Sequence, residues 1–182
     1  MEKSDCYLRP FLKKEVRLYK NWIEDPLVVG PHLSVENISL ETLLKDFQKN
    51  RWQNNEISRW LLCRKDREGY EKLLGFGHAW QFDRYETHME FGRIILPPYR
   101  SKGIGTPLLK LLIDQVFRQF PETLRLQAIT GCSNIACLRT WEKARIQIEG
   151  KLRKFMTLKE EQVDCYIGSI LRKEWKRDDE TK

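Results

Sequence analysis

The sequence contains no long hydrophobic run. None of its segments approaches the roughly 18 consecutive apolar residues that a membrane-spanning helix requires. Its opening, MEKSDCYLRPF, also lacks the continuous apolar stretch of a secretory signal peptide. Together these absences favour a cytoplasmic protein that does not enter a membrane.

Cysteine and histidine are few and follow no ligand pattern. The five cysteines form no Cys-x-x-Cys pair, and their odd number argues against a complete disulfide framework. The three histidines have no metal-ligand spacing, either among themselves or with the cysteines. We therefore expect reduced thiols and no metal site.

Linkers, repeats and low-complexity segments are also missing, so we expect a single domain over residues 1–182. The composition, 41% hydrophobic and 32% charged, is typical of a globular protein with a sizeable core. The net charge of +7 is compatible with nucleic acid or with a phosphorylated cofactor, and does not choose between them. Mixed charges at the C-terminus predict a solvated end over 172–182.

Hydrophobic spacing predicts an alternation of strands and helices. The order is β-α-α-β-β-β-α-β-α-β-β, which predicts the α/β class, with one mixed, mostly antiparallel sheet of six or seven strands and helices on both faces. The helical segments are 13–24, 39–49, about four turns that follow the loop 99–106 and end near 119, and 134–144. The strand segments are 6–9, 60–63, 72–82, 88–96, 124–129, 146–155 and 163–171.

A basic loop with two glycines precedes the third predicted helix. Residues 99–106 read Tyr-Arg-Ser-Lys-Gly-Ile-Gly-Thr. The first N–H groups of a helix lack partners, glycine lets an anion approach the backbone, and Arg100 and Lys102 add full charges. The loop is not a P-loop, and Leu108 stands where a dinucleotide-binding fingerprint has its third glycine. A phosphate cradle and a plain strand-to-helix turn both remain open on the loop alone.

Two motifs in this half of the chain resemble the GCN5-related N-acetyltransferase (GNAT) superfamily. Arg100-Ser-Lys-Gly103-Ile-Gly105 is similar to the family's Arg-x-x-Gly-x-Gly loop for the cofactor pyrophosphate. The run from Asn134 to Ala144 resembles the family's second motif. Other features resemble the branch that acetylates the N-termini of ribosomal proteins, namely Leu8-Arg-Pro, Trp22, Glu149-Gly150 with Arg153, Asp164, and Glu174-Trp175.

The resemblance implies a splayed GNAT-like sheet and acetyl-CoA as co-substrate. In the family, the backbone of the loop holds the pyrophosphate, and the strand before it pairs with the pantetheine arm. Carried over residue by residue, the cofactor contacts are Ile94, Ile95, Leu96, Arg100, Ser101, Lys102, Gly103, Ile104, Gly105, Thr106, Asn134 and Lys143.

The implied reaction is direct attack of a primary amine on the thioester in a ternary complex. Glu90 resembles the glutamate that some members use as a base, and a solvent-facing or ion-paired strand residue is the alternative. Trp141 stands where many members carry a tyrosine that protonates the departing thiolate, and Arg145-Ile146 replaces the usual Gly-Phe. An indole N–H is not a usable acid, so Cys137 is the candidate substitute, with a buried small hydrophobe as the alternative.

The acceptor is expected over the N-terminal helices and the loop near 28–35. Four aromatic residues are candidate walls, although each also fits a core position, namely Trp22, His32, Trp52 and Trp80. His88, on the same strand face as Glu90, is a further substrate-side candidate, with a surface histidine as the alternative. A polyamine would need a carboxylate-rich pocket, for which the chain offers Glu36, Glu41, Asp83 and Glu86.

The sequence does not fix the class of acceptor amine, but it favours an α-amine over a lysine-like amine. An α-amine of pKa ~7.8 is about 14% neutral at pH 7, whereas a lysine-like amine is neutral in about one molecule in 2,500. With the positive net charge, this favours a protein N-terminal amine. The alternatives are a small-molecule amine (polyamine, aminoglycoside or amino acid), a CoA-binding module without catalysis, and a basic RNA-binding protein. We expect a monomer or homodimer without specific DNA binding.

Overall fold

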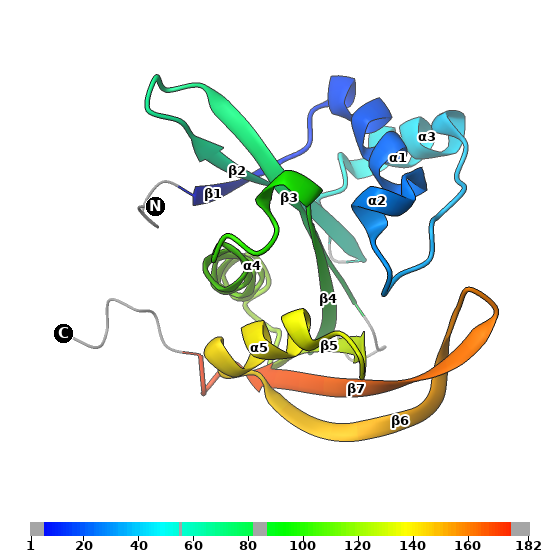
Figure 1. Ribbon diagram of the computed structural model, residues 1–182. Coiled ribbons are helices and arrows are strands. Elements are labelled where there is room, and N and C mark those ends of the chain that lie inside the picture. The colour runs from blue at the N-terminus through cyan, green and yellow to red at the C-terminus, as the bar shows by residue number, and fades with distance from the viewer. Residues whose placement is uncertain (1–5, 55, 82–86, 176–182) are drawn as a thin grey trace.

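The computed structural model describes residues 6–54, 56–81 and 87–175. These residues build a seven-stranded sheet in the order β1-β2-β3-β4-β5-β7-β6 (Figure 1). Neighbouring strands are antiparallel except for β4 and β5, which are parallel. The strands are β1 (Cys6–Pro10), β2 (Ile57–Lys65), β3 (Glu71–Gln81), β4 (His88–Ile95), β5 (Arg125–Gly131), β6 (Gln147–Leu158) and β7 (Glu161–Leu171).

The main helices follow the predicted order. They are α1 (Val16–Glu24), α3 (Leu40–Asn50), α4 (Gly105–Gln119) and α5 (Ile135–Lys143). Ser39 caps α3 and Asn134 caps α5, each through a side-chain oxygen that accepts a first-turn N–H. The 3-10 turn η1 (Lys13–Glu15) forms the start of the predicted helical segment 13–24. The short helix α2 (Pro26–Val29) and the 3-10 turn η2 (Pro97–Tyr99) are additions, because segments this short show no hydrophobic period.

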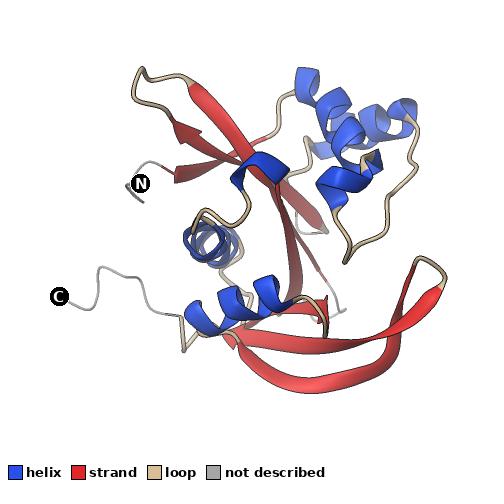
Figure 2. Cartoon of the chain, in the orientation of Figure 1, coloured by secondary structure: helices blue, strands red, loops and turns tan. Residues whose placement is uncertain are grey.

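Side-chain alternation along β3 places a helical layer on each face of the sheet (Figure 2). Phe76 packs against Tyr19 and Trp22 of α1, with ring centroids 5.1 and 5.9 Å away. Gly77 points the other way, where a Cβ would lie 2.9 Å from Leu112 of α4. We call these the α1 face and the α4 face. Helix α5 lies on the α4 face, in the same core cluster.

Strands β4 and β5 are paired over three residues only, and the pairing ends at Glu90 and Gln127. Beyond that point β4 continues beside β3, and β5 continues beside β7. The two strands therefore separate, as the resemblance implied. We call this opening the β4–β5 fork; in Figure 1 β4 runs upward from it, whereas β7 crosses the picture beneath it.

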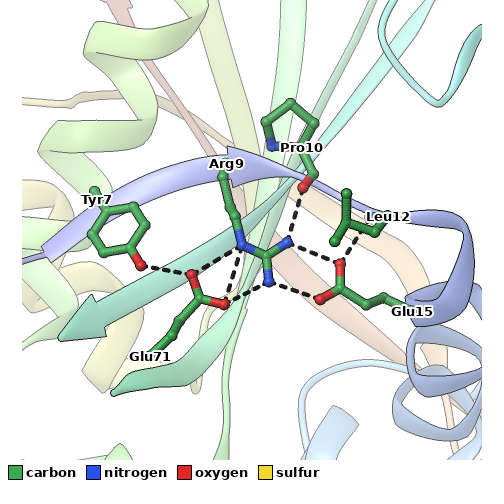
Figure 3. A network of polar contacts seen from close by, with 6 residues as sticks. All are labelled: Tyr7, Arg9, Pro10, Leu12, Glu15 and Glu71. Carbon is green, nitrogen blue, oxygen red and sulfur yellow. Dashed lines mark hydrogen bonds and ion pairs between the residues drawn. The ribbon is translucent and has the colours of Figure 1, made fainter. Parts of the chain in front are cut away.

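A network around Arg9 joins β1 to β3 and to η1 (Figure 3). The Arg9 guanidinium donates to both carboxylates, Glu71 at 2.6 Å and Glu15 at 2.7 Å, and the Tyr7 hydroxyl donates to Glu71 at 2.6 Å. Hydrogen bonds from Arg9 and Tyr7 lower the pKa of Glu71 to about 2. Hydrogen bonding to Glu71 raises the pKa of Tyr7 to about 12. The network ties the edge strand to the N-terminal helices.

The residues just after β7 are packed on the core, unlike the solvated end predicted over 172–182. Arg172 donates to the carbonyls of Phe117, Phe120 and Thr123, and Trp175 packs 5.8 Å from the Phe117 ring. Residues 176–182 lie outside the described residues. Among the described helices, none is long and apolar enough to span a membrane.

Candidate active site

Glu90 lies at the last paired position of the β4–β5 fork. Its carboxylate accepts a hydrogen bond from the Gln127 side-chain amide at 3.1 Å. Partial burial raises the pKa of Glu90, and the hydrogen bond from Gln127 opposes part of that rise. A raised pKa makes a carboxylate a better proton acceptor near neutral pH.

A chain of polar contacts on the α1 face holds Gln127 in place. Its side-chain oxygen accepts from Arg125 Nε at 3.3 Å. Arg125 in turn forms a two-point ion pair with Glu149 and donates to Ser169 at 2.9 Å. The Arg125 guanidinium lowers the pKa of Glu149 to about 2. Because Arg125 takes the oxygen of the Gln127 amide, the NH₂ group is turned to Glu90.

Two predicted acceptor-side residues flank Glu90 on the α1 face. Trp80 lies directly opposite Glu90 across β3 and β4, and His88 precedes it by two residues on the same face. His78 stands next to Trp80, with ring centroids 5.1 Å apart, and burial lowers its pKa to about 4. His78 is therefore neutral near pH 7. It faces Gly92, where a Cβ would lie only 2.4 Å from the imidazole.

The free edge of β4 offers fewer backbone groups than the sequence suggested. The Leu96 N–H donates to Leu74 of β3 at 2.8 Å, and antiparallel pairing turns alternate residues toward the same neighbour. The backbone groups of Ile94 and Leu96 therefore face β3, which removes both residues from the predicted pantetheine contacts. Ile95 keeps its place, and Arg93 joins it at the free edge.

The loop at the start of α4 has the geometry of an anion cradle. Ser101 and Gly103 adopt positive φ angles of 58° and 76°. Within the described ranges, the backbone N–H groups from Ser101 to Thr106 donate to no protein acceptor. Such unsatisfied donors at a helix start fit a phosphate group. The exposed side chain of Lys102 lies in the same loop.

Arg100 does not extend from the loop as a free charge. Its guanidinium donates to the carbonyls of Ile95 at 2.8 Å and Leu27 at 3.0 Å, and also to the carbonyl of Val28. These bonds tie the loop to the end of α2. The predicted charge contact between Arg100 and the pyrophosphate is therefore replaced by a structural role.

The first turn of α4 meets α5 beside Arg93. A Cβ on Gly105 would lie 3.2 Å from Thr140 Cγ2 and 3.8 Å from Arg93 Nη2. Arg93 Nη2 donates to the Thr140 hydroxyl at 2.9 Å. The second glycine of the loop thus allows close contact between the two helices and leaves the Arg93 guanidinium at the start of α4.

Helix α5 uses its predicted functional residues mainly for structure. The Asn134 carboxamide caps the helix and also donates to Thr130 at 3.1 Å. Trp141 is buried, and its indole fills the space above Gly168, where a Cβ would meet it at 2.7 Å. The Cys137 thiol is largely buried, which raises its pKa. Lys143 is exposed in the last turn.

The loop after α2, where the acceptor is predicted, contacts the β6–β7 hairpin. Ser34, in the loop after α2, donates to the Thr157 carbonyl near the tip of the β6–β7 hairpin at 3.4 Å (Figure 1). His32 lies partly exposed in that loop. Trp22 and Trp52, in contrast, are 9% and 0% exposed, so both belong to the core and are removed from the candidate walls.

Sequence reasoning missed three polar residues at the fork. Arg93, Arg125 and Gln127 each lie in an apparently ordinary strand, and only strand pairing brings them beside Glu90 or α4. The alternation of polar and apolar residues in 124–129 was the only available signal. Among the described residues, no group of three or more His, Cys, Asp and Glu side chains is placed to hold a metal ion.

A seven-stranded sheet whose parallel strands β4 and β5 separate, with a loop of unsatisfied N–H groups at the start of the helix between them, fits the fold of acyl-CoA-dependent transferases. The family model "Acetyltransferase (GNAT) domain" matches residues 6–147. The chain therefore belongs to the GNAT acetyltransferase family, and it is an N-acetyltransferase that uses acetyl-CoA.

Solved structures share the fold. Spermidine N-acetyltransferase from Vibrio cholerae, in complex with CoA and spermine, is 18% identical and has a TM-score of 0.79, covering 94% of this chain and 98% of that one. A chimera of the Vibrio cholerae enzyme SpeG with hSSAT is 19% identical with a TM-score of 0.76, covering 93% and 97%.

Proposed function

We propose that the chain acetylates the α-amine of a peptide or protein N-terminus, with Glu90 accepting the amine proton directly or through water. The position of Glu90 at the fork is the observation that carries this proposal. The acetyl donor lies along the free edge of β4, and the acceptor approaches from the α1 face, where Glu90, Trp80 and His88 lie together.

The chemistry required of the protein is modest. Acetyl-CoA supplies the activated acyl group. The amine attacks the thioester carbonyl, its proton passes to Glu90, and the C–S bond breaks to release CoA as a thiolate, which takes a proton from water. With Trp141 buried in the core, no side-chain acid is assigned to this departure. Burial favours proton acceptance by Glu90 because it raises the pKa of the carboxylate.

The charges around the acceptor side favour a single amine over a polyamine. The β6–β7 hairpin carries Lys151, Arg153 and Lys154, and its Asp164 is already paired with Lys151 at 2.7 Å. Arg125 neutralises Glu149 in the same way. Of the carboxylates that could bind a polyamine, Glu41 pairs with Lys45 on α3. Asp83 and Glu86 lie outside the described residues.

A polyamine acceptor is the second candidate. The similar structures are of spermidine N-acetyltransferases, and one of them holds spermine. At 18% identity the likeness extends to the fold, so the acceptor has to be measured on this chain.

An acceptor panel with a thiol-release assay tests both candidates. It compares short peptides having a free α-amine, the same peptides N-terminally blocked but containing lysine, and spermidine. We expect turnover with the free α-amine peptides, and a loss of kcat of about a hundredfold in Glu90→Gln. Glu68→Gln, in the exposed turn between β2 and β3, is a control with the same change of charge. Turnover confined to spermidine would replace the α-amine proposal with the polyamine one.

A further inference from the structure

Arg93 is a partly buried cation that has no anionic partner among the described residues. It forms no ion pair within the described part of the chain, and its polar contact to protein is the Thr140 hydroxyl at 2.9 Å. Its Nε is buried with no hydrogen-bond acceptor. Buried charges in folded proteins are normally paired, so this arrangement is incomplete in the protein alone.

Arg93 also lies close to a second positive group, the N-terminus of helix α4. Its Nη2 reaches the first residue of α4, within 3.8 Å of where a Gly105 side chain would begin. Helix α4 is 15 residues long, and its N-terminus carries a partial positive charge. Two positive groups at short range destabilise each other unless an anion lies between them.

We propose that Arg93 binds the diphosphate of acetyl-CoA and thereby takes the role that the loop motif assigns to Arg100. The inference rests on acetyl-CoA as co-substrate and does not depend on which amine is acetylated. Arg100 is occupied by three backbone carbonyls, so it cannot turn to the cofactor without releasing α2. Arg93 lies on the free edge of β4. Its guanidinium is next to Gly105, at the start of α4, where the backbone N–H groups from Ser101 to Thr106 have no acceptor.

This role predicts opposite effects of one substitution on the free and the bound protein. Arg93→Met keeps the aliphatic length and removes the unpaired charge, so the free protein should melt at the same or a higher temperature. Acetyl-CoA should bind about tenfold to a hundredfold more weakly, as expected for the loss of a charge-assisted contact. Arg67→Met, in the exposed β2–β3 turn, removes one positive charge far from the fork and is the matched control.

The experiment measures melting temperature and Kd by titration calorimetry for wild type, Arg93→Met and Arg67→Met. The ligands are CoA, dephospho-CoA, which lacks the 3′-phosphate, and desulfo-CoA, which lacks the thiol. A contact to the diphosphate is supported if Arg93→Met binds all three ligands more weakly by the same factor while Arg67→Met binds them as the wild type does. Weakening that disappears with dephospho-CoA or with desulfo-CoA assigns Arg93 to the 3′-phosphate or to the thiol and overturns the proposal.

Two further outcomes are decisive. A lower melting temperature with unchanged Kd would make Arg93 a structural residue. If Arg93→Met does not fold, Arg93→Gln replaces it, since it keeps a polar group beside Thr140 and removes the charge, and an unchanged Kd again contradicts the proposal. Failure of the wild type to bind CoA at all would contradict the use of the cofactor itself, which is a separate result.

Discussion

The Glu90 carboxylate and the Gln127 carboxamide are joined at 3.1 Å across the last residue pair that β4 and β5 share. Gln127 is itself oriented by Arg125, whose charge is balanced by Glu149. The candidate base is therefore held by a chain of side chains that reaches across β5 to the edge strand β6. Residues far from the acceptor can consequently alter how Glu90 titrates.

Replacing Gln127 should shift the pH dependence of the reaction. Its hydrogen bond stabilises the ionised carboxylate, so Gln127→Leu should raise the pKa of Glu90 further. Glu90 must be ionised to accept a proton, and the acidic limb of the kcat profile should move to higher pH by about 0.5–1 unit. Gln162→Leu, on the exposed part of β7, should leave the limb unmoved. An unshifted limb in Gln127→Leu would show that Glu90 does not govern it.

Gly103 should be replaceable only by a residue that accepts positive φ. Its φ is 76°, and a Cβ there would meet nothing within 4 Å, so the restriction is conformational and not steric. Gly103→Val should lower acetyl-CoA affinity by about tenfold or more, because valine forces the loop N–H groups out of alignment. Gly103→Asn should bind nearly as well as the wild type. The acetyl-CoA-induced rise in melting temperature measures both, and equal rises in the two variants would contradict a cradle at this loop.

Gly92→Ala should destabilise the fold through His78. The new methyl group would lie 2.4 Å from His78 Nε2, and the crowding should cost about 1–3 kcal/mol of unfolding free energy. His78→Ser removes the obstacle, so the double variant should lose less stability than the two single changes summed. Urea denaturation of the four proteins completes the cycle. Additive losses would mean that His78 does not cause the strain.

The Arg9 network should fail in acid. The pKa of Glu71 is about 2 when folded and 4.5 when unperturbed, so its contribution is complete above about pH 4.5 and is lost as the pH falls toward 2. Because the side chain is 32% exposed, we expect Glu71→Gln to cost only about 1 kcal/mol at pH 7. The wild type and the variant should converge in stability near pH 2. Glu68→Gln in the neighbouring turn is the control, and a constant difference at every pH would argue against this linkage.

Cys137→Ala should test the remaining candidate for a catalytic acid. The thiol is largely buried and its pKa is raised, which is typical of a packing residue as well as of a protonated donor. We expect kcat to stay within about threefold of the wild type, because a CoA thiolate leaves without an acid. A loss of about a hundredfold, with an alkaline limb removed from the kcat profile, would instead assign the acid role to Cys137.

Local sequence determined the order of the elements and the conformation of the loop before α4. Hydrophobic spacing placed the four main helices, and Ser39 and Asn134 cap α3 and α5 as short-range signals suggest. Gly103 in a left-handed conformation and the helix beginning at Gly105 follow from residues adjacent in the chain. The motif around them was sufficient to indicate the family.

Only the tertiary structure decided what individual side chains do. Arg100 binds carbonyls of α2, Trp22 stacks on Phe76, and Arg93 lies between α4 and α5, because each contact joins residues distant in sequence. The β4–β5 fork also depends on tertiary structure. Strands β4 and β5 are neighbours in the sheet although helix α4 separates them in the sequence. Spacing along one strand reports which face a residue occupies, whereas its partner depends on which strand or helix packs against that face.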